Sequence, residues 1–368
     1  MKKLSNIYLL LALSVVIISC DSDKKNKEIA ITTFEKKQAK IKNVIFLIGD
    51  GMGLSQVSAS QYYNENPTSF ERFSVIGLSK TSSSSDVITD SAAGATALAS
   101  GVKTFNGAIG VTPDSLAVET IVEQISSRGI STGIISTSAI THATPACFYA
   151  HVTSRRNEEE IAHFLINSEI DFFAGGGLKF FNEREDNADL LKLLNENGFK
   201  VSTDKLPKKP SKKKAAILLS KKGMPTMLEG RGDFLPEATK LALETLSKNK
   251  EGFFLMVEGS QIDWGGHAND SDYLISELLD FDKTIGIALN FAKQDGETLV
   301  IVTADHETGG FTLASDDGDY NKIKPVFSTG GHSATMVPVF AEGPGAEIFG
   351  GIYENTSIYD KIKSFFIE

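Results

Sequence analysis

The sequence contains very little cysteine, and this limits how the chain can be stabilised. Only Cys20 and Cys147 occur among 368 residues, so disulfides cannot be the framework of the fold. Cys147 stands beside Pro145, Ala146, Phe148 and Tyr149, and this apolar setting favours a buried structural thiol over a reactive one.

A long apolar run is also missing. The run from Ile7 to Ser19 is too short for a typical transmembrane helix, and Lys2 and Lys3 precede it, as in a signal peptide. It ends Ile17-Ile18-Ser19-Cys20, which resembles a bacterial lipobox and implies cleavage before Cys20 and lipidation of its sulfur. An uncleaved anchor is the alternative, and both alternatives describe an exported protein.

These features divide the chain into three parts. We expect a lipoprotein signal peptide over residues 1–20, a charged tether poor in apolar residues over 21–41, and one large domain over 42–368. The predicted location is a membrane anchor facing the periplasm or the cell surface.

Positive charge is in deficit, since the formal net charge is −10. This balance argues against nucleic acid as a partner, and it requires local positive charge at any site for an anionic substrate. Residues 205–222 are rich in lysine, but no aromatic residues lie between the lysines. We therefore predict a small, solvated peripheral insertion there.

Apolar runs alternate with helical patterns along most of the chain. Together they predict an α/β fold with a mostly parallel central sheet and helices on both faces. The predicted strands are 43–48, 132–135, 253–257, 299–303 and 337–341. The predicted helices are 55–64, 115–127, 158–166, 236–247, 271–292 and 357–366.

One further helix is predicted between Asp90, a suitable N-cap, and Gly101, a suitable C-terminal stop. Ser91 would lie in its first turn, where free backbone N–H groups favour negative charge on an alkoxide or a phosphate. Taken alone, the stretch is equally compatible with an ordinary capped helix. Its small side chains would allow close approach to a metal site.

Acidic residues and histidines gather where the predicted strands end. The residues are Asp50, Glu258, Asp263, His267, Asp305, His306 and His332. Ligands bind beyond the carboxyl ends of strands in such sheets, and this mixture suits zinc and magnesium. Four carboxylates in one cleft would require cations to balance their charge.

From Lys42 to Glu368 the chain resembles the alkaline phosphatases. The matching stretches are 43–53, 89–110, 143–155, 257–267, 302–307 and 330–333. The resemblance implies hydrolysis of phosphate monoesters through a phosphoserine, and homodimers are typical of the family. A phosphodiesterase or sulfatase of the same superfamily is the nearest alternative, but Ser91 lacks the X-Pro-X-Arg sequence expected after a sulfatase nucleophile. A non-catalytic lipoprotein that binds metal or phosphate is a further alternative.

The resemblance also implies roles for individual residues. Ser91 matches the nucleophile, and it is also expected among the metal ligands. Arg155 matches the arginine that binds phosphate. Two zinc ions and one magnesium ion are implied, with their ligands drawn from Asp263, His267 and His332 for the first zinc, from Asp50, Asp305 and His306 for the second, and from Asp50, Thr144 and Glu258 for the magnesium.

Two positions depart from the aspartate and lysine that well-known bacterial members carry. This chain has His142 and Trp264 there, a combination that resembles marine or cold-adapted bacterial members. Both are predicted to line the phosphate site, and His142 leaves the third metal open between magnesium and zinc. His151 and His163 match no ligand position and are predicted to be structural.

The lipobox generates the first testable prediction. Cys20→Ser removes the sulfur that would carry lipid, so the variant should move from the membrane fraction to the soluble fraction. Cell fractionation with immunodetection measures this. A variant that stays with the membrane would show that the apolar run is an uncleaved helix.

Overall fold

The fold is organised around one ten-stranded sheet. The computed structural model describes residues 41–212 and 214–367. In spatial order the strands are β14 (Gly351–Glu354), β2 (Val75–Lys80), β13 (Val337–Glu342), β8 (Thr298–Thr303), β1 (Asn43–Gly49), β7 (Phe253–Gly259), β3 (Ser131–Ala139), β4 (Phe172–Gly176), β6 (Lys214–Leu218) and β5 (Phe199–Ser202). Only β13 runs antiparallel to its neighbours, which confirms the predicted mostly parallel sheet.

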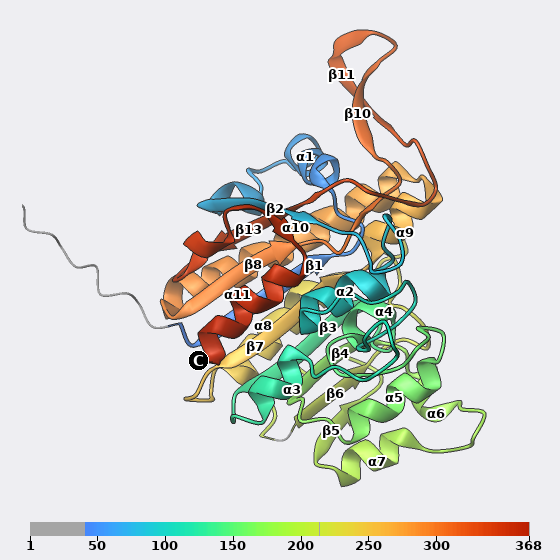
Figure 1. Cartoon of the computed structure of the whole chain (residues 1–368), viewed down its shortest axis with the longest axis vertical. Coiled ribbons are helices and arrows are strands. Elements are labelled where there is room, and N and C mark those ends of the chain that lie inside the picture. Colours follow the sequence, from blue (N-terminus) through green and yellow to red (C-terminus); the bar gives the residue numbers. More distant parts are fainter. Residues whose placement is uncertain (1–40, 213, 368) are drawn as a thin grey trace, which may run out of the picture. The chain divides into compact units, whose positions relative to one another are not determined.

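Helices cover both faces of the sheet, as predicted (Figure 1). Side chains alternate along β1, so Phe46 enters one apolar core and Leu47 the other. The first core is completed by α2 (Ser91–Ser100), α3 (Ile121–Ser126), α5 (Glu158–Ile166), α7 (Leu190–Glu196) and α11 (Thr356–Phe366). The second is completed by α1 (Leu54–Tyr63), α8 (Phe234–Leu246) and α10 (Ser271–Asp295).

Most predicted helices are confirmed with small shifts at their ends, but the prediction for 115–127 is wrong in its first half. The helix there, α3, begins only at Ile121. Thr120 caps it, because its hydroxyl accepts from the Glu123 N–H at 3.2 Å while the Glu123 carboxylate accepts from the Thr120 N–H at 2.8 Å. Ser115 adopts a φ of 64°, which is incompatible with a right-handed helix.

The prediction of a peripheral insertion over 205–222 is also wrong in part. Strand β6 lies inside this range and pairs with β4 and β5 in the central sheet. Its residues Ala215 to Leu218 are buried. The lysines on both sides of this short apolar run led to the wrong prediction. Burial of both faces of the strand and pairing on both of its edges outweigh that local charge.

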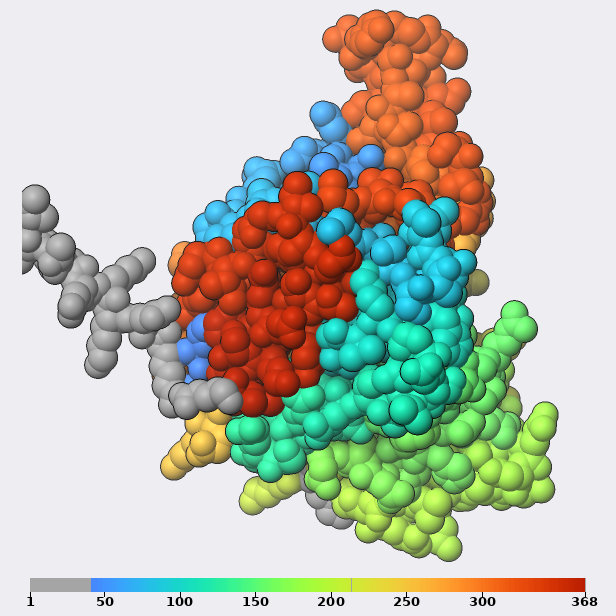
Figure 2. All heavy atoms as spheres, viewed as in Figure 1, coloured from blue at the N-terminus to red at the C-terminus, as the bar shows by residue number. Residues whose placement is uncertain are grey.

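A second, smaller feature does project from the body. Strands β10 (Thr312–Asp316) and β11 (Asp319–Val326) form an antiparallel hairpin that stands away from the sheet (Figures 1 and 2). It begins just after β9 (Glu307–Thr308) and returns to β12 (His332–Ser333), which pair with each other. The hairpin is therefore inserted between two stretches that carry predicted metal ligands.

Within residues 41–212 and 214–367, no helix is long and apolar enough to cross a membrane. The predicted signal peptide, most of the tether and the lipidation site Cys20 lie outside the described residues.

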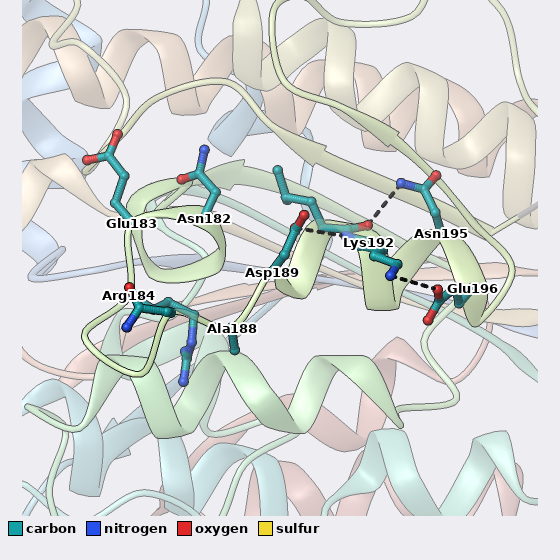
Figure 3. A pocket seen from close by; sticks show the side chains of 10 residues that line it. Asn182, Glu183, Arg184, Ala188, Asp189, Lys192, Asn195 and Glu196 are labelled. Atoms are coloured by element: carbon teal, nitrogen blue, oxygen red, sulfur yellow. Dashed lines mark hydrogen bonds and ion pairs between the residues drawn. The ribbon is translucent and has the colours of Figure 1, made fainter.

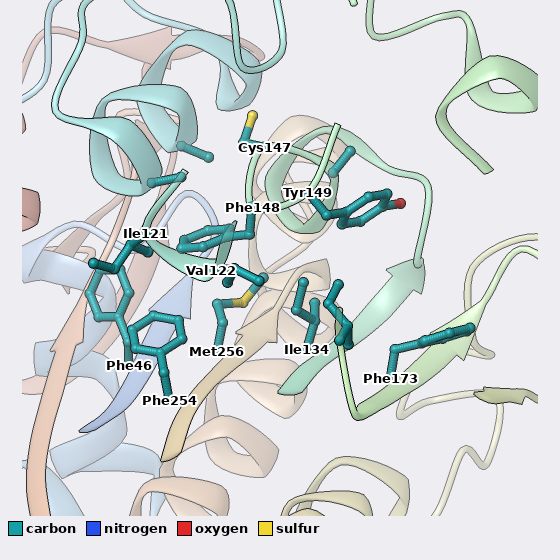
Figure 4. Packing of buried hydrophobic residues seen from close by; sticks show 14 of the residues in the cluster. Phe46, Ile121, Val122, Ile134, Cys147, Phe148, Tyr149, Phe173, Phe254 and Met256 are labelled. Atoms are coloured by element: carbon teal, nitrogen blue, oxygen red, sulfur yellow. The ribbon is translucent and has the colours of Figure 1, made fainter. Parts of the chain in front are cut away.

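The first core generates a prediction about stability. Phe148 is fully buried and packs against Phe46 and Phe254, with ring centroids 6.3 and 6.2 Å away (Figure 4). Phe148→Ala should lower the free energy of unfolding by about 3–5 kcal/mol, measured by denaturant titration. Tyr320→Ala is the control, because Tyr320 is 93% exposed on the hairpin. Equal losses in the two variants would contradict this account of the core.

Candidate metal centre and catalytic site

The site lies at the carboxyl edge of three adjacent strands. Asp50 follows β1, Glu258 lies near the end of β7, and Asp305 follows β8. Because Ile48 of β1 is in register with both Glu258 and Thr303, these carboxylates reach the same edge of the sheet. The sheet therefore brings together side chains that are far apart in sequence.

A first cluster combines Asp263, His267 and His332. Asp263 and His267 lie one turn apart on α9 (Gln261–Ala268), and Asp263 Oδ1 is 3.4 Å from His267 Nε2 and 3.6 Å from His332 Nε2. The Nδ1 atoms of both histidines face carbonyl oxygens at 2.8 Å, Gly330 for His267 and Thr89 for His332.

This arrangement fixes the lone pairs of the two imidazoles. A ring nitrogen that faces a carbonyl must carry the hydrogen, so in the neutral rings both Nε2 atoms present lone pairs. Those two atoms are only 3.1 Å apart. Two lone pairs and a carboxylate oxygen at this separation fit a cation between them.

A second cluster surrounds His306. Its Nε2 lies 3.3 Å from Asp305 Oδ2, 3.5 Å from Asp50 Oδ1 and 3.3 Å from Ser91 Oγ. Both carboxylate oxygens are buried and lack any hydrogen-bond partner. Burial, followed by the charges of Asp305 and Asp263, raises the pKa of Asp50 well above its ordinary value. Carboxylate oxygens without a hydrogen-bond donor and a raised carboxyl pKa are both expected at a site that a cation would neutralise.

A third cluster combines Asp50, His142 and Glu258. Glu258 Oε2 accepts hydrogen bonds from Ser136 and Ser260 at 2.6 Å each, whereas its Oε1 is buried without a partner. Burial raises the pKa of Glu258 to about 7 despite these bonds. Thr144 donates to Asp50 Oδ2 at 3.5 Å, so the predicted hydroxyl ligand also reaches this cluster.

Ser91 occupies the predicted place in the first turn of α2. Asp90 caps the helix through a 3.0 Å bond from the Ala93 N–H, and Gly101 ends it with a φ of 71°. Gly94 allows close contact with the acidic cluster, because a Cβ there would lie 3.1 Å from Asp305 Cβ. The positive end of the helix is thereby held against the second cluster.

Arg155 is fixed on two sides. Its Nη1 donates to Asp90 Oδ2 at 3.0 Å, and its Nη2 donates to His142 Nε2 at 3.2 Å. Burial and the charge of Arg155 lower the pKa of His142 to about 3, so the imidazole is neutral and can accept. Trp264 meets the His142 ring edge-on, with centroids 5.9 Å apart. The structure thus places all the residues predicted for the site around one centre.

Several residues that support the ligands were not predicted. Thr308 Oγ1 donates to Asp263 Oδ1 at 2.5 Å and lies 3.2 Å from His306 Nδ1, so it links two clusters. Ser136 and Ser260 orient Glu258, as described above. The only sequence signal was their place at or just after the ends of apolar strands, and that signal does not distinguish them from ordinary turn residues.

The remaining predicted structural residues lie outside the centre. His151 contacts the Gly110 carbonyl at 2.7 Å and Glu123 at 2.9 Å, and His163 lies on α5. Cys147 is buried, and burial raises the pKa of its thiol to about 12. Both facts agree with an inert structural cysteine.

One wide pocket lies elsewhere and does not belong to this centre. Its volume is about 900 Å³, and ten residues between Asn182 and Glu196 line it (Figure 3). Several polar groups there already have partners: Asp189 accepts from the Lys192 N–H, Arg184 pairs with the neighbouring Asp186, and Lys192 lies near Glu196.

A buried serine at a helix N-terminus, an arginine and clustered carboxylates and imidazoles define a metal-dependent hydrolase of anionic esters. The alkaline phosphatase family model matches residues 41–323. The chain therefore belongs to the alkaline phosphatase family and is a metal-dependent phosphomonoester hydrolase.

Relatives and solved structures agree with this assignment. Alkaline phosphatase 3 of Bacillus subtilis is 35% identical over 416 residues, covering 88% of this chain and 89% of the relative. Alkaline phosphatase from the Antarctic bacterium TAB5 is 55% identical, with a TM-score of 0.88 over 90% of this chain and 99% of that chain. Two variants of the TAB5 protein, with histidine replaced by aspartate or glutamate, have Mg bound in the M3 site.

Thr308 generates a prediction about metal affinity. Thr308→Val removes the hydroxyl that contacts Asp263 and His306, so the affinity of the centre for a divalent cation, probed with Zn²⁺, should fall about 10- to 100-fold. Competition with a chromophoric chelator measures the affinity. Thr308→Ser is the matched control because it keeps the hydroxyl. Unchanged affinity in the valine variant would show that Thr308 does not position the ligands.

Proposed function

We propose that the enzyme hydrolyses phosphate monoesters by transferring the phosphoryl group first to Ser91 and then to water. The observation that carries this proposal is the position of Ser91 Oγ, buried at the positive end of α2 and 3.3 Å from His306 Nε2. The other two hydroxyls on that helix have partners elsewhere: Thr96 donates to the Ala108 carbonyl at 3.3 Å, and Ser100 donates to the Thr96 carbonyl at 2.8 Å.

We further propose two zinc ions and one magnesium ion as the resident metals. Asp263, His267 and His332 would hold the first zinc, and Asp50, Asp305 and His306 the second, because imidazole with carboxylate suits zinc. Asp50, Thr144 and Glu258 would hold magnesium, whereas His142 would favour zinc at the same place. Two histidine-to-acid variants of the TAB5 protein have Mg bound in the M3 site, which supports magnesium as an occupant when an acid stands there. When bound, the ions supply positive charge that favours the Ser91 alkoxide and the departing oxygen.

The residues of the chain then have defined tasks. Arg155, fixed by Asp90 and His142, would bind two nonbridging phosphate oxygens as a fork. Ser91 Oγ would lose its proton to solvent and form a bond to phosphorus, while the bond from phosphorus to the alcohol oxygen breaks and the departing oxygen takes a proton from solvent. Attack by water on the phosphoserine then releases inorganic phosphate and restores the hydroxyl. The neutral indole of Trp264 adds no positive charge to the phosphate-binding site.

The lipobox motif supports a proposal about location. The protein would be exported and anchored through lipid on Cys20, with the enzyme domain facing the periplasm or the cell surface. A homodimer is proposed on the resemblance to the family alone.

Phosphoenzyme trapping tests the role of Ser91. After a brief reaction with a radiolabelled monoester and an acid quench, label should be found on Ser91. Ser91→Ala should lose the label and lower kcat by about two or more orders of magnitude.

Ser100→Ala is the matched control, since it removes a buried hydroxyl from the same helix away from the centre. It should keep the label. A phosphorylated residue other than Ser91, or label that persists in Ser91→Ala, would overturn the assignment.

A further inference from the structure

The indole of Trp264 packs against Gly223, which lies outside the short sequence stretches matched to the alkaline phosphatases and outside the metal centre. A Cβ built on Gly223 would lie 2.7 Å from Trp264 Cη2 and 3.1 Å from Cζ3, whereas the next atom, Ser138 Cα, is 3.7 Å away. Gly223 does not have a positive φ. Its backbone conformation is therefore compatible with alanine, and the only close contact of the new methyl group would be with the outer edge of the indole.

The segment that carries Gly223 is firmly held. The Lys222 carbonyl accepts from the Gly177 N–H at 2.7 Å, Ser220 Oγ donates to the Gly223 carbonyl at 2.7 Å, and the Met224 N–H donates to the Thr137 carbonyl at 2.9 Å. These bonds flank Gly223 on both sides, so the segment cannot easily retreat from a new methyl group.

The helix that carries Trp264 is also held. Gly265, the next residue on α9, packs against α10 so closely that a Cβ would lie 2.5 Å from the Leu274 nitrogen. The backbone of α9 therefore has no room to shift toward α10. A methyl group on residue 223 must displace the indole itself.

Displacement of the indole would reach the phosphate site. Trp264 touches the His142 ring edge-on, and His142 Nε2 accepts from Arg155 Nη2 at 3.2 Å. We propose that Gly223 is a positioning residue: its bare backbone seats the Trp264 indole and thereby fixes His142 and the Arg155 guanidinium. This inference rests on the proposed role of Arg155 in binding phosphate.

The sequence supplies a direct reporter, because Trp264 is the only tryptophan in the chain. In metal-loaded Gly223→Ala, the tryptophan emission should change before any ligand is added. The inhibition constant for inorganic phosphate should rise about three- to tenfold, the effect of losing part of one charged hydrogen bond. Gly350→Ala is the matched control, since a Cβ there meets no atom closer than 3.8 Å.

A second background makes the test specific. Phenylalanine lacks the outer indole atoms that a Cβ on residue 223 would meet, so Gly223→Ala should have no further effect on phosphate inhibition in Trp264→Phe. The proposal is overturned if Gly223→Ala raises the phosphate inhibition constant by the same factor with Trp264 present and in Trp264→Phe. It is also overturned if Gly223→Ala changes neither the tryptophan emission nor the inhibition constant. If Gly223→Ala fails to fold, recovery of folding in the double variant supports the contact and continued misfolding refutes it.

Arg155→Ser separates this inference from the function it rests on. If that change leaves phosphate inhibition unaltered, Arg155 does not bind phosphate and the proposed function fails at that point. The emission of Gly223→Ala still shows whether residue 223 seats the indole. If Arg155→Ser changes phosphate inhibition while Gly223→Ala leaves both the inhibition and the tryptophan emission unchanged, only the role of Gly223 is refuted.

Discussion

Buried negative charge is the constraint on which this structure depends. Asp50, Glu258 and Asp305 are fully or almost fully buried where three neighbouring strands end, and Asp263 lies beside them. One oxygen of each of the first three carboxylates, Asp50 Oδ1, Glu258 Oε1 and Asp305 Oδ2, has no hydrogen-bond donor. Buried charge of this kind is strongly destabilising unless a cation compensates it. A chain that keeps these residues together is therefore a chain built to bind metal ions.

The surrounding fold is shaped to hold that charge in place. The parallel strands deliver the carboxylates to one edge, and α2 directs its N-terminus at them. Gly94 permits the close approach of that helix to Asp305. Hydroxyl groups such as Thr308 and Ser260 fix the orientation of individual carboxylates. Under the proposed function, geometry of this kind would let bound cations act on Ser91 with little reorganisation.

Much of this could be predicted from sequence because the ligands come with local signals. Asp50 and His306 each follow an apolar strand, and Asp90 with Gly101 marks the limits of α2. Strand β6 was missed because its short apolar run stands next to lysines, and only pairing with β4 and β5 makes it a strand.

Positions defined by tertiary contact carried no such signal. Nothing near Gly223 in the sequence indicates that an indole from α9 rests on it. Thr308 likewise acquires its role only when β9 brings it between Asp263 and His306. Helix α3 was predicted too long because the irregular segment before Thr120, where Ala117 forms an isolated β-bridge with Val111, has a composition that is also compatible with a helix.

The central claim is that cations neutralise the buried acidic cluster. The most direct measurement is calorimetric titration of the chelator-stripped protein with zinc and then magnesium, with elemental analysis of the product. The account predicts saturable binding of more than one ion per chain, release of protons because carboxylates with raised pKa values must ionise, and a higher unfolding temperature. A stripped protein that binds no ions and is as stable as the original would contradict it.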